Sequence, residues 1–200
     1  MTAIAIGRLL RSSTTGFVFG CSVPEPDVPC FGDFVKAPAQ RQQAEVIGLI
    51  YDIAIEDDPF VRQMAATPNL PEAYILDQRE NRQVPIEVSV LAVGYRQGRD
   101  QGEFFQALPP QPPITLDQIS LCGSEEVGVF NRQLDYLGLI LAAPDIPADE
   151  LLGSALRNAA AALPIAERRP FLIRAGQECA RLLCRDLVRL DNVLRKIKHG

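Results

Sequence analysis

The sequence has no tryptophan, one histidine and three lysines in 200 residues, and it has no long apolar run. A membrane-spanning helix needs ~20 consecutive apolar residues, so we expect no membrane segment. The first ten residues, MTAIAIGRLL, lack a basic stretch before their short apolar run, and a secretory signal is therefore not expected. These absences predict a cytoplasmic protein.

The single histidine argues against nucleophilic catalysis, which needs an imidazole held in a packed site beside Ser or Cys. It is His199, near the end of the sequence, where chains are usually mobile. The densest acidic cluster, Glu56-Asp57-Asp58, precedes a proline and is more typical of a solvated loop than of a metal or catalytic site. We therefore predict no catalytic residue, no metal and no cofactor, and hence a protein that is not an enzyme.

The five cysteines form no CxxC pair and have no histidine near them. Structural zinc sites use four Cys or His ligands in paired short spacings, so these cysteines do not indicate one. We expect buried free thiols in a reducing compartment. The residues are Cys21, Cys30, Cys122, Cys179 and Cys184.

The first 123 residues contain short β-rich runs separated by turn signals, a pattern typical of a small barrel or sandwich. Glycines in or beside these runs permit the bends of a closed sheet, so we predict a small closed barrel of about six strands. The polar segment 56–83, with a short helix at about 59–66, is expected to be an insertion between two strands. The strands are expected at 3–11, 15–21, 31–36, 44–53, 85–95, 104–108 and 114–122.

From residue 124 the apolar spacing changes to three and four residues, which indicates helices. The spacing and the prolines predict helices at about 125–141, 148–163 and 166–197, the last of them one long helix. The fold class is therefore α+β, with a barrel domain at 1–123 and a helical region at 124–200.

The predicted long helix has an apolar stripe and a basic face. The stripe fits either the core of this chain or a contact with a second chain, because a helix of ~45 Å can extend beyond a small barrel. The basic face fits phosphate or an acidic partner, or a solvated surface balanced by nearby acids, which is the commoner arrangement. The stripe residues are Leu183, Leu187, Leu190, Leu194 and Ile197, and the basic residues are Arg174, Arg181, Arg185 and Arg189.

The net charge of −5 is unevenly distributed along the chain. Residues 167–200 contain nine Lys or Arg against four Asp or Glu, whereas the other 166 residues contain eleven basic and twenty-one acidic residues. The acidic part would repel phosphate, so any contact with nucleic acid is expected to use the C-terminal helix.

The opening β region resembles the HAS-barrel, the N-terminal barrel shared by HerA-type DNA-translocating ATPases and the catalytic subunits of rotary ATP synthases. The likeness covers roughly residues 4–130 and includes the strand at 86–94 and the proline-rich 109–113. Its motifs, in order, are Ile6-Gly7-Arg8-Leu9, Ser12-Ser13-Thr14 with Phe17-Val18-Phe19, Gly32-Asp33-Phe34-Val35, and Val46-Ile47-Gly48-Leu49-Ile50-Tyr51-Asp52-Ile53.

The resemblance implies a barrel that contacts other subunits and docks partners, and it does not imply ATP hydrolysis. In HerA-type proteins the barrel precedes an ATPase core whose phosphate loop reads G-x-x-x-x-G-K-[ST]. The three lysines here are Lys36, Lys196 and Lys198, and none follows such a glycine loop.

Two functions of different classes follow from these features. The first is a non-enzymatic assembly or adaptor module that self-associates or docks a partner such as a HerA-like ATPase or nuclease. The alternative is a nucleic-acid-binding module that uses the basic face of the C-terminal helix, although an acidic barrel with few aromatic residues suits single strands poorly. An enzyme with a site in the 56–83 insertion ranks last, because no set of residues supports it.

Overall fold

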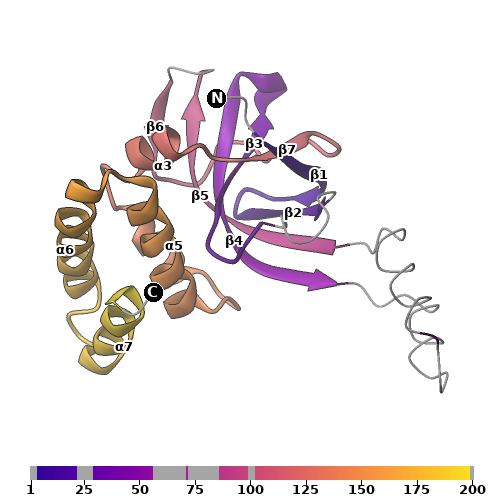
Figure 1. The fold of residues 1–200 in the computed structure, drawn as a ribbon. Helices are drawn as coiled ribbons and strands as arrows, with labels where there is room; N and C mark the ends of the chain where they lie inside the picture. The colour runs from indigo at the N-terminus through magenta and orange to yellow at the C-terminus, as the bar shows by residue number, and fades with distance from the viewer. Residues whose placement is uncertain (1–3, 22–28, 56–70, 72–85, 99–101, 199–200) are drawn as a thin grey trace.

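The computed structural model describes residues 4–21, 29–55, 71, 86–98 and 102–198, and Figure 1 shows their arrangement. In this part of the chain a β-barrel is followed by five α-helices, so the predicted α+β class is confirmed. The strands are β1 (Ala5–Ser12), β2 (Gly16–Cys21), β3 (Phe34–Ala39), β4 (Ala44–Ile55), β5 (Ile86–Gln97), β6 (Glu103–Phe105) and β7 (Gln118–Leu121), with a 3-10 turn η1 (Gln40–Gln42). The helices are α3 (Ser124–Phe130), α4 (Tyr136–Ala142), α5 (Ala148–Ala162), α6 (Ile165–Leu182) and α7 (Leu187–Lys198).

Six strands close into an antiparallel barrel, as predicted. Their order is β2-β1-β7-β3-β4-β5, and the ring closes because β5 also pairs with β2, while β6 extends β5 outside the ring. β1 and β2 approach so closely that a Cβ on Gly7 would lie 2.1 Å from the carbonyl oxygen of Gly20. A side chain at this position would overlap the neighbouring strand, which explains the glycine at residue 7.

The barrel encloses a core made of strand residues alone. Alternate side chains of each strand point inward, and Leu9, Phe19, Val35 and Ile50 are completely enclosed there. β5 shows why the sequence pattern succeeded, since Val88 and its alternate neighbours point into the barrel while the residues between them face outward. The predicted insertion 56–83, apart from residue 71, lies outside the described residues.

The prediction of one helix at 125–141 is wrong, because the chain forms two helices there, α3 and α4, with residues 131–135 between them. The side chain of Gln106 caps both helices. Its amide nitrogen donates to the Phe130 carbonyl at 2.7 Å, and its oxygen accepts from the Tyr136 N–H at 3.0 Å. The buried Asn131 accepts a hydrogen bond from the Tyr136 hydroxyl at 2.8 Å, so side-chain hydrogen bonds stabilise the break.

The single long helix predicted at 166–197 is also wrong, since α6 ends at Leu182 and α7 begins at Leu187. Asp186 caps the new helix: its Oδ1 accepts from the Arg189 N–H at 3.0 Å. The chain then folds back, and Val193 and Ile197 on α7 become buried. A straight helix would leave these two side chains in water, so their burial favours the break.

Helix α5 is the centre of the helical part and lies between the barrel and the outer helices (Figure 1). It contacts each of the other four helices as well as β4. Its small residues, among them Ala155 and Ala159, are completely buried and let the neighbouring helices approach closely. Among the described helices, none combines the length and the apolar character needed to cross a bilayer.

Candidate functional site

Four charged side chains meet where the barrel joins the helical part. Lys36 comes from β3, Glu45 from β4, Arg96 from β5 and Glu126 from α3. Lys36 Nζ lies 2.6 Å from Glu126 Oε1, and Arg96 Nη2 lies 3.1 Å from the same oxygen. Arg96 Nε donates to Glu45 Oε2 at 2.9 Å. We name these four residues the junction network.

The junction network balances its charges internally. Partial burial alone would raise the pKa of Glu126, but hydrogen bonds from Lys36 and from the Gly123 N–H, with the charges of Lys36 and Arg96, outweigh burial and lower it. Burial raises the pKa of the neighbouring Cys122 thiol far above its ordinary value, so this sulfur is not activated as a nucleophile. The arrangement fastens α3 to the barrel rather than exposing a reactive group.

A second link joins the turn before β3 to α5. Asp33 Oδ2 accepts from the Cys30 N–H at 2.8 Å, and Oδ1 accepts from Asn158 Nδ2 at 3.0 Å. Burial raises the pKa of Asp33, and the Cys30 N–H partly opposes that rise. Gly32 has φ +84°, and a Cβ there would lie 2.5 Å from Ser154 Oγ. The Gly32-Asp33 motif of the resemblance therefore docks the helical part on the barrel.

The four arginines expected on one helix face lie on two helices and the turn between them, so the structure does not bring them together. Arg174 Nη2 donates to the Asn131 carbonyl at 3.1 Å, and its guanidinium lies 5.7 Å from the Phe171 ring centroid. Arg189 forms an ion pair with α5, because its Nε lies 2.7 Å from Asp149 Oδ1. Both guanidinium groups therefore serve contacts within the chain.

The other two arginines lie at and beyond the end of α6 and are exposed. Arg181 Nε donates to Glu178 Oε2 at 3.0 Å, and this contact raises the pKa of Arg181 and lowers that of Glu178. Arg185 lies in the turn 183–186, away from any helix face. A phosphate-binding row at four-residue spacing is thus absent from α6 and α7 as the structure describes them.

The predicted leucine stripe is divided between core and surface. Leu183 and Ile197 are buried, and Leu190 is half-buried. Leu187 is 70% exposed, and Leu194, which lies against Gly176 of α6, is 38% exposed. The break at 183–186 rotates α7 relative to α6, so equal spacing in the sequence no longer gives one face.

Exposed apolar side chains gather on these same two helices. The large apolar residues exposed on α6 and α7 are Ile165, Ile173, Leu187, Val188 and Leu194. We name them the α6–α7 apolar set. The sequence stripe includes only two of its members, because the others lie outside the 4-3-4 spacing that defined the stripe.

Other sequence candidates remain outside the described residues, namely His199 and the Glu56-Asp57-Asp58 cluster. Within the described residues, no three His, Cys, Asp or Glu side chains lie close enough together to hold a metal ion. Sequence reasoning missed the junction network. Lys36, on a strand whose next residues are apolar, was the available signal, because a lone lysine among buried neighbours needs a partner.

Comparison with protein-family models finds none that matches this chain, and comparison with curated proteins finds no match either. The resemblance to the HAS-barrel therefore stays a prediction that rests on the motifs quoted from the sequence.

Proposed function

We propose that this chain is a non-enzymatic assembly or docking module, in which the barrel is the platform and helices α6 and α7 provide the contact surface. The observation that carries the proposal is the placement of exposed apolar side chains. Of the ten large apolar residues exposed in the described part of the chain, five form the α6–α7 apolar set. Half of the large exposed apolar residues thus lie on two adjacent helices, and this concentration supports a contact surface there.

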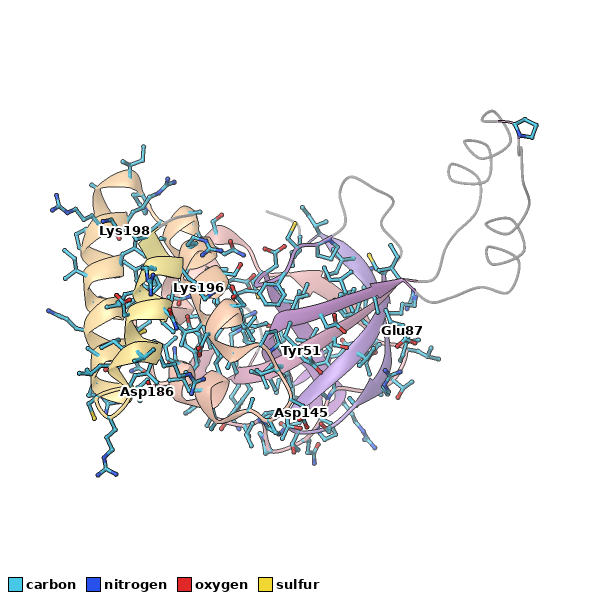
Figure 2. All side chains as sticks on the ribbon, turned by 90° about the horizontal axis from the view of Figure 1, so that it is seen from below. Tyr51, Glu87, Asp145, Asp186, Lys196 and Lys198 are labelled. Atoms are coloured by element: carbon cyan, nitrogen blue, oxygen red, sulfur yellow. The ribbon has the colours of Figure 1, made fainter. Side chains whose placement is uncertain are left out.

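The position of the two helices supports this role. In Figures 1 and 2, α6 and α7 lie on the side of α5 that faces away from the barrel. Asp186 and Lys198 are on this outer side, whereas Glu87 is at the opposite end of the described part of the chain (Figure 2). A partner can therefore bind α6 and α7 without displacing the barrel strands.

The proposed partners are a second copy of this chain or a separate HerA-like ATPase or nuclease, and the proposed location is the cytoplasm. The first partner follows from Leu187 and Leu194, the exposed members of the predicted stripe, and the second follows from the resemblance to a barrel that precedes an ATPase core in HerA-type proteins. A role in DNA processing is proposed only if the partner is the HerA-like ATPase or nuclease.

The nucleic-acid alternative is less well supported than the docking role. It required the four arginines on one face, and three of them make contacts within the chain, to Asn131, Glu178 and Asp149. Phosphate would have to replace these contacts. A filter-binding titration at low salt tests the alternative, and we expect no salt-dependent DNA affinity.

The docking proposal is tested by sedimentation velocity and by affinity purification from nuclease-treated native extract. We expect the wild-type protein to self-associate or to recover a partner in fixed stoichiometry. The double variant Leu187→Asp with Val188→Asp should lose this property, because both side chains are at the contact surface. Leu116→Asp is the control, since Leu116 is 66% exposed but lies on the barrel side.

A strictly monomeric wild-type protein that recovers no partner would contradict the proposal. Association that survives the double variant but is lost in Leu116→Asp would move the contact surface from the helices to the barrel.

A further inference from the structure

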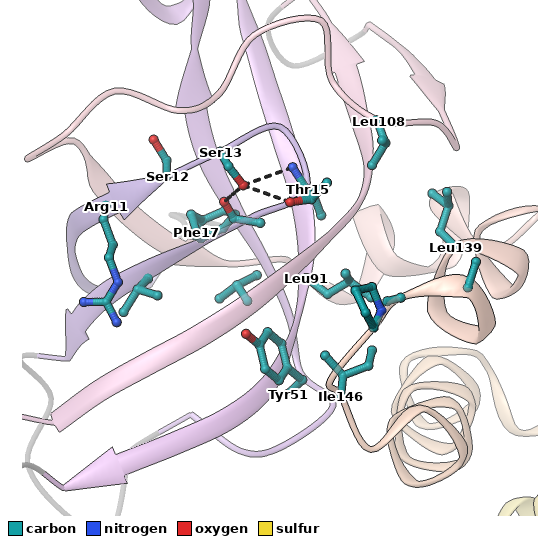
Figure 3. A pocket seen from close by; sticks show the side chains of 17 residues that line it. Arg11, Ser12, Ser13, Thr15, Phe17, Tyr51, Leu91, Leu108, Leu139 and Ile146 are labelled. Atoms are coloured by element: carbon teal, nitrogen blue, oxygen red, sulfur yellow. Dashed lines mark hydrogen bonds between the residues drawn. The ribbon is translucent and has the colours of Figure 1, made fainter.

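A groove of about 520 Å³ lies between the β1–β2 turn and the segment that follows α4. Its floor is formed by β4 and β5, and Figure 3 shows it from close by. Ligand sites of small molecules usually measure roughly 300–1,000 Å³ and combine apolar walls with a few converging polar groups. The groove meets both conditions, and none of its lining residues belongs to the α6–α7 apolar set.

One end of the groove is polar. Ser13 Oγ is hydrogen-bonded to Thr15 Oγ1 at 2.9 Å and donates to the Gly16 carbonyl at 3.2 Å, which fixes the turn. Arg11 lies beside this turn (Figure 3). Its Nη2 is 3.1 Å from Glu87 Oε2, and its side chain is 65% exposed. Such an exposed ion pair is weak, and the guanidinium keeps further donors that an anion can use.

The opposite end is apolar. Leu108, Leu139 and Ile146 surround it, and Leu91 forms the floor (Figure 3). Tyr51 stands between the two ends, and in this view its hydroxyl is on the side toward Arg11. Within the described residues, that hydroxyl has no hydrogen-bond partner, so it remains a donor for a ligand.

We propose that this groove binds a small amphipathic carboxylate, with one apolar chain against Leu91, Leu108 and Leu139 and its carboxylate at Arg11 and the Tyr51 hydroxyl. The charge balance selects a monoanion, because Arg11 is the only cation among the described residues that line the groove, and Glu87 already lies beside it. A phosphate dianion would meet one cation and one carboxylate. The site goes beyond the docking role and is independent of it.

The test is calorimetric titration with octanoate, and with octan-1-ol as the uncharged analogue. We expect octanoate to bind the wild-type protein at submillimolar concentration. Arg11→Gln should weaken octanoate about tenfold and leave octanol unchanged, because one charge-assisted hydrogen bond is lost. Arg8→Gln is the matched control, since Arg8 is on the same strand but donates to the Leu116 carbonyl, outside the groove.

A second pair of variants tests the apolar end. Leu108→Ser should weaken both ligands about fivefold, because apolar contact area is lost. Leu10→Ser should change neither, since Leu10 is 43% exposed against 45% for Leu108 but does not line the groove. Amide chemical shifts on adding octanoate should change at 11–18 and 139–146.

Three results would overturn the site. The first is no octanoate binding at millimolar concentration, and the second is equal octanoate affinity in the wild-type protein and Arg11→Gln. The third is a set of shift changes that lies away from the groove. The α6–α7 double variant keeps octanoate binding whether or not the docking role holds, so the two proposals fail separately.

Discussion

The barrel and the helices that follow it hold their shapes in different ways. Six strands are hydrogen-bonded in a closed ring around a core of strand residues alone. The second core contains residues of all five helices, but it also contains Phe34, Leu49, Leu91 and Val93 from the outer face of the strands. The barrel core can therefore form without the helices, whereas the helical core needs the outer surface of the barrel.

The largest loss of stability is expected when a side chain is removed from inside the barrel. Phe19→Ala should destabilise the protein by about 4 kcal/mol, because Phe19 is completely buried and leaves a cavity. Hydrogen exchange should show that protection is lost in α5 as well as in the strands. Leu151→Ala, in α5, should instead reduce protection mainly in the helices. Helices that stay protected in Phe19→Ala would break the comparison.

A smaller effect is expected at the turn that docks α5. Gly32→Ala should cost about 3 kcal/mol, since alanine disfavours φ +84° and its Cβ would overlap Ser154 Oγ. Urea denaturation followed by circular dichroism measures the loss. The matched control is Gly138→Ala in α4, where an added Cβ meets nothing within 4 Å and should stabilise the helix slightly. Equal stability of the two variants would contradict the docking role of the turn.

The junction network allows a pH test of the same comparison. The pKa of Glu126 is lower in the folded protein than its ordinary value of 4.5. Its contribution is therefore complete above pH 4.5 and is lost as the pH falls through the lower folded value. Glu126→Gln should be about 2 kcal/mol less stable at pH 7, and the difference from wild type should shrink below pH 4.

Urea midpoints across this pH range give the measurement. Glu125→Gln is the control, because Glu125 is exposed and outside the network. The raised pKa of Asp33 has the opposite pH dependence, but it is common to both proteins and cancels in the difference. A constant difference from pH 3 to 7 would show that the charge of Glu126 does not hold α3 to the barrel.

The smallest effect is expected at the start of α7. Asp186→Ala should cost about 1 kcal/mol through loss of the helix cap, and only α7 should lose protection. Hydrogen exchange with mass spectrometry resolves this helix from α6. Asp191→Ala, which removes an exposed pair with Arg195, is the control and should have little effect.

The strands could be predicted because their signal is local. Alternation along 86–90 and the adjacent turns depends only on neighbours in the sequence, and the barrel satisfies that pattern. The break between α3 and α4 could not be predicted, since its cap is the side chain of Gln106, which belongs to a distant segment. The break before α7 had a readable signal, because Asp186 directly precedes an apolar-periodic segment. This signal was overlooked because the three- and four-residue leucine spacing continues across the break.

Like the junction network, the groove was not anticipated by sequence reasoning. Its polar end comes from the β1–β2 turn and its apolar end mainly from Leu108, from α4 and from the segment after α4, and the packing of α4 and α5 on the strands brings these together. The Ser-Ser-Thr motif was noticed as part of a resemblance, but nothing in its spacing indicated Leu139 or Ile146 as neighbours.

The pairing of Ala5 on β1 with Ser120 on β7 joins the first and last strands of the barrel. During synthesis β1 can pair with β2 early, but β7 emerges only after nearly the whole barrel sequence, so this pairing is a contact of high sequence separation, a feature of slowly folding topologies. The helices are translated directly afterwards. When the helices emerge, all strands of the barrel surface on which they pack have been synthesised. Their apolar faces can therefore be buried soon after translation.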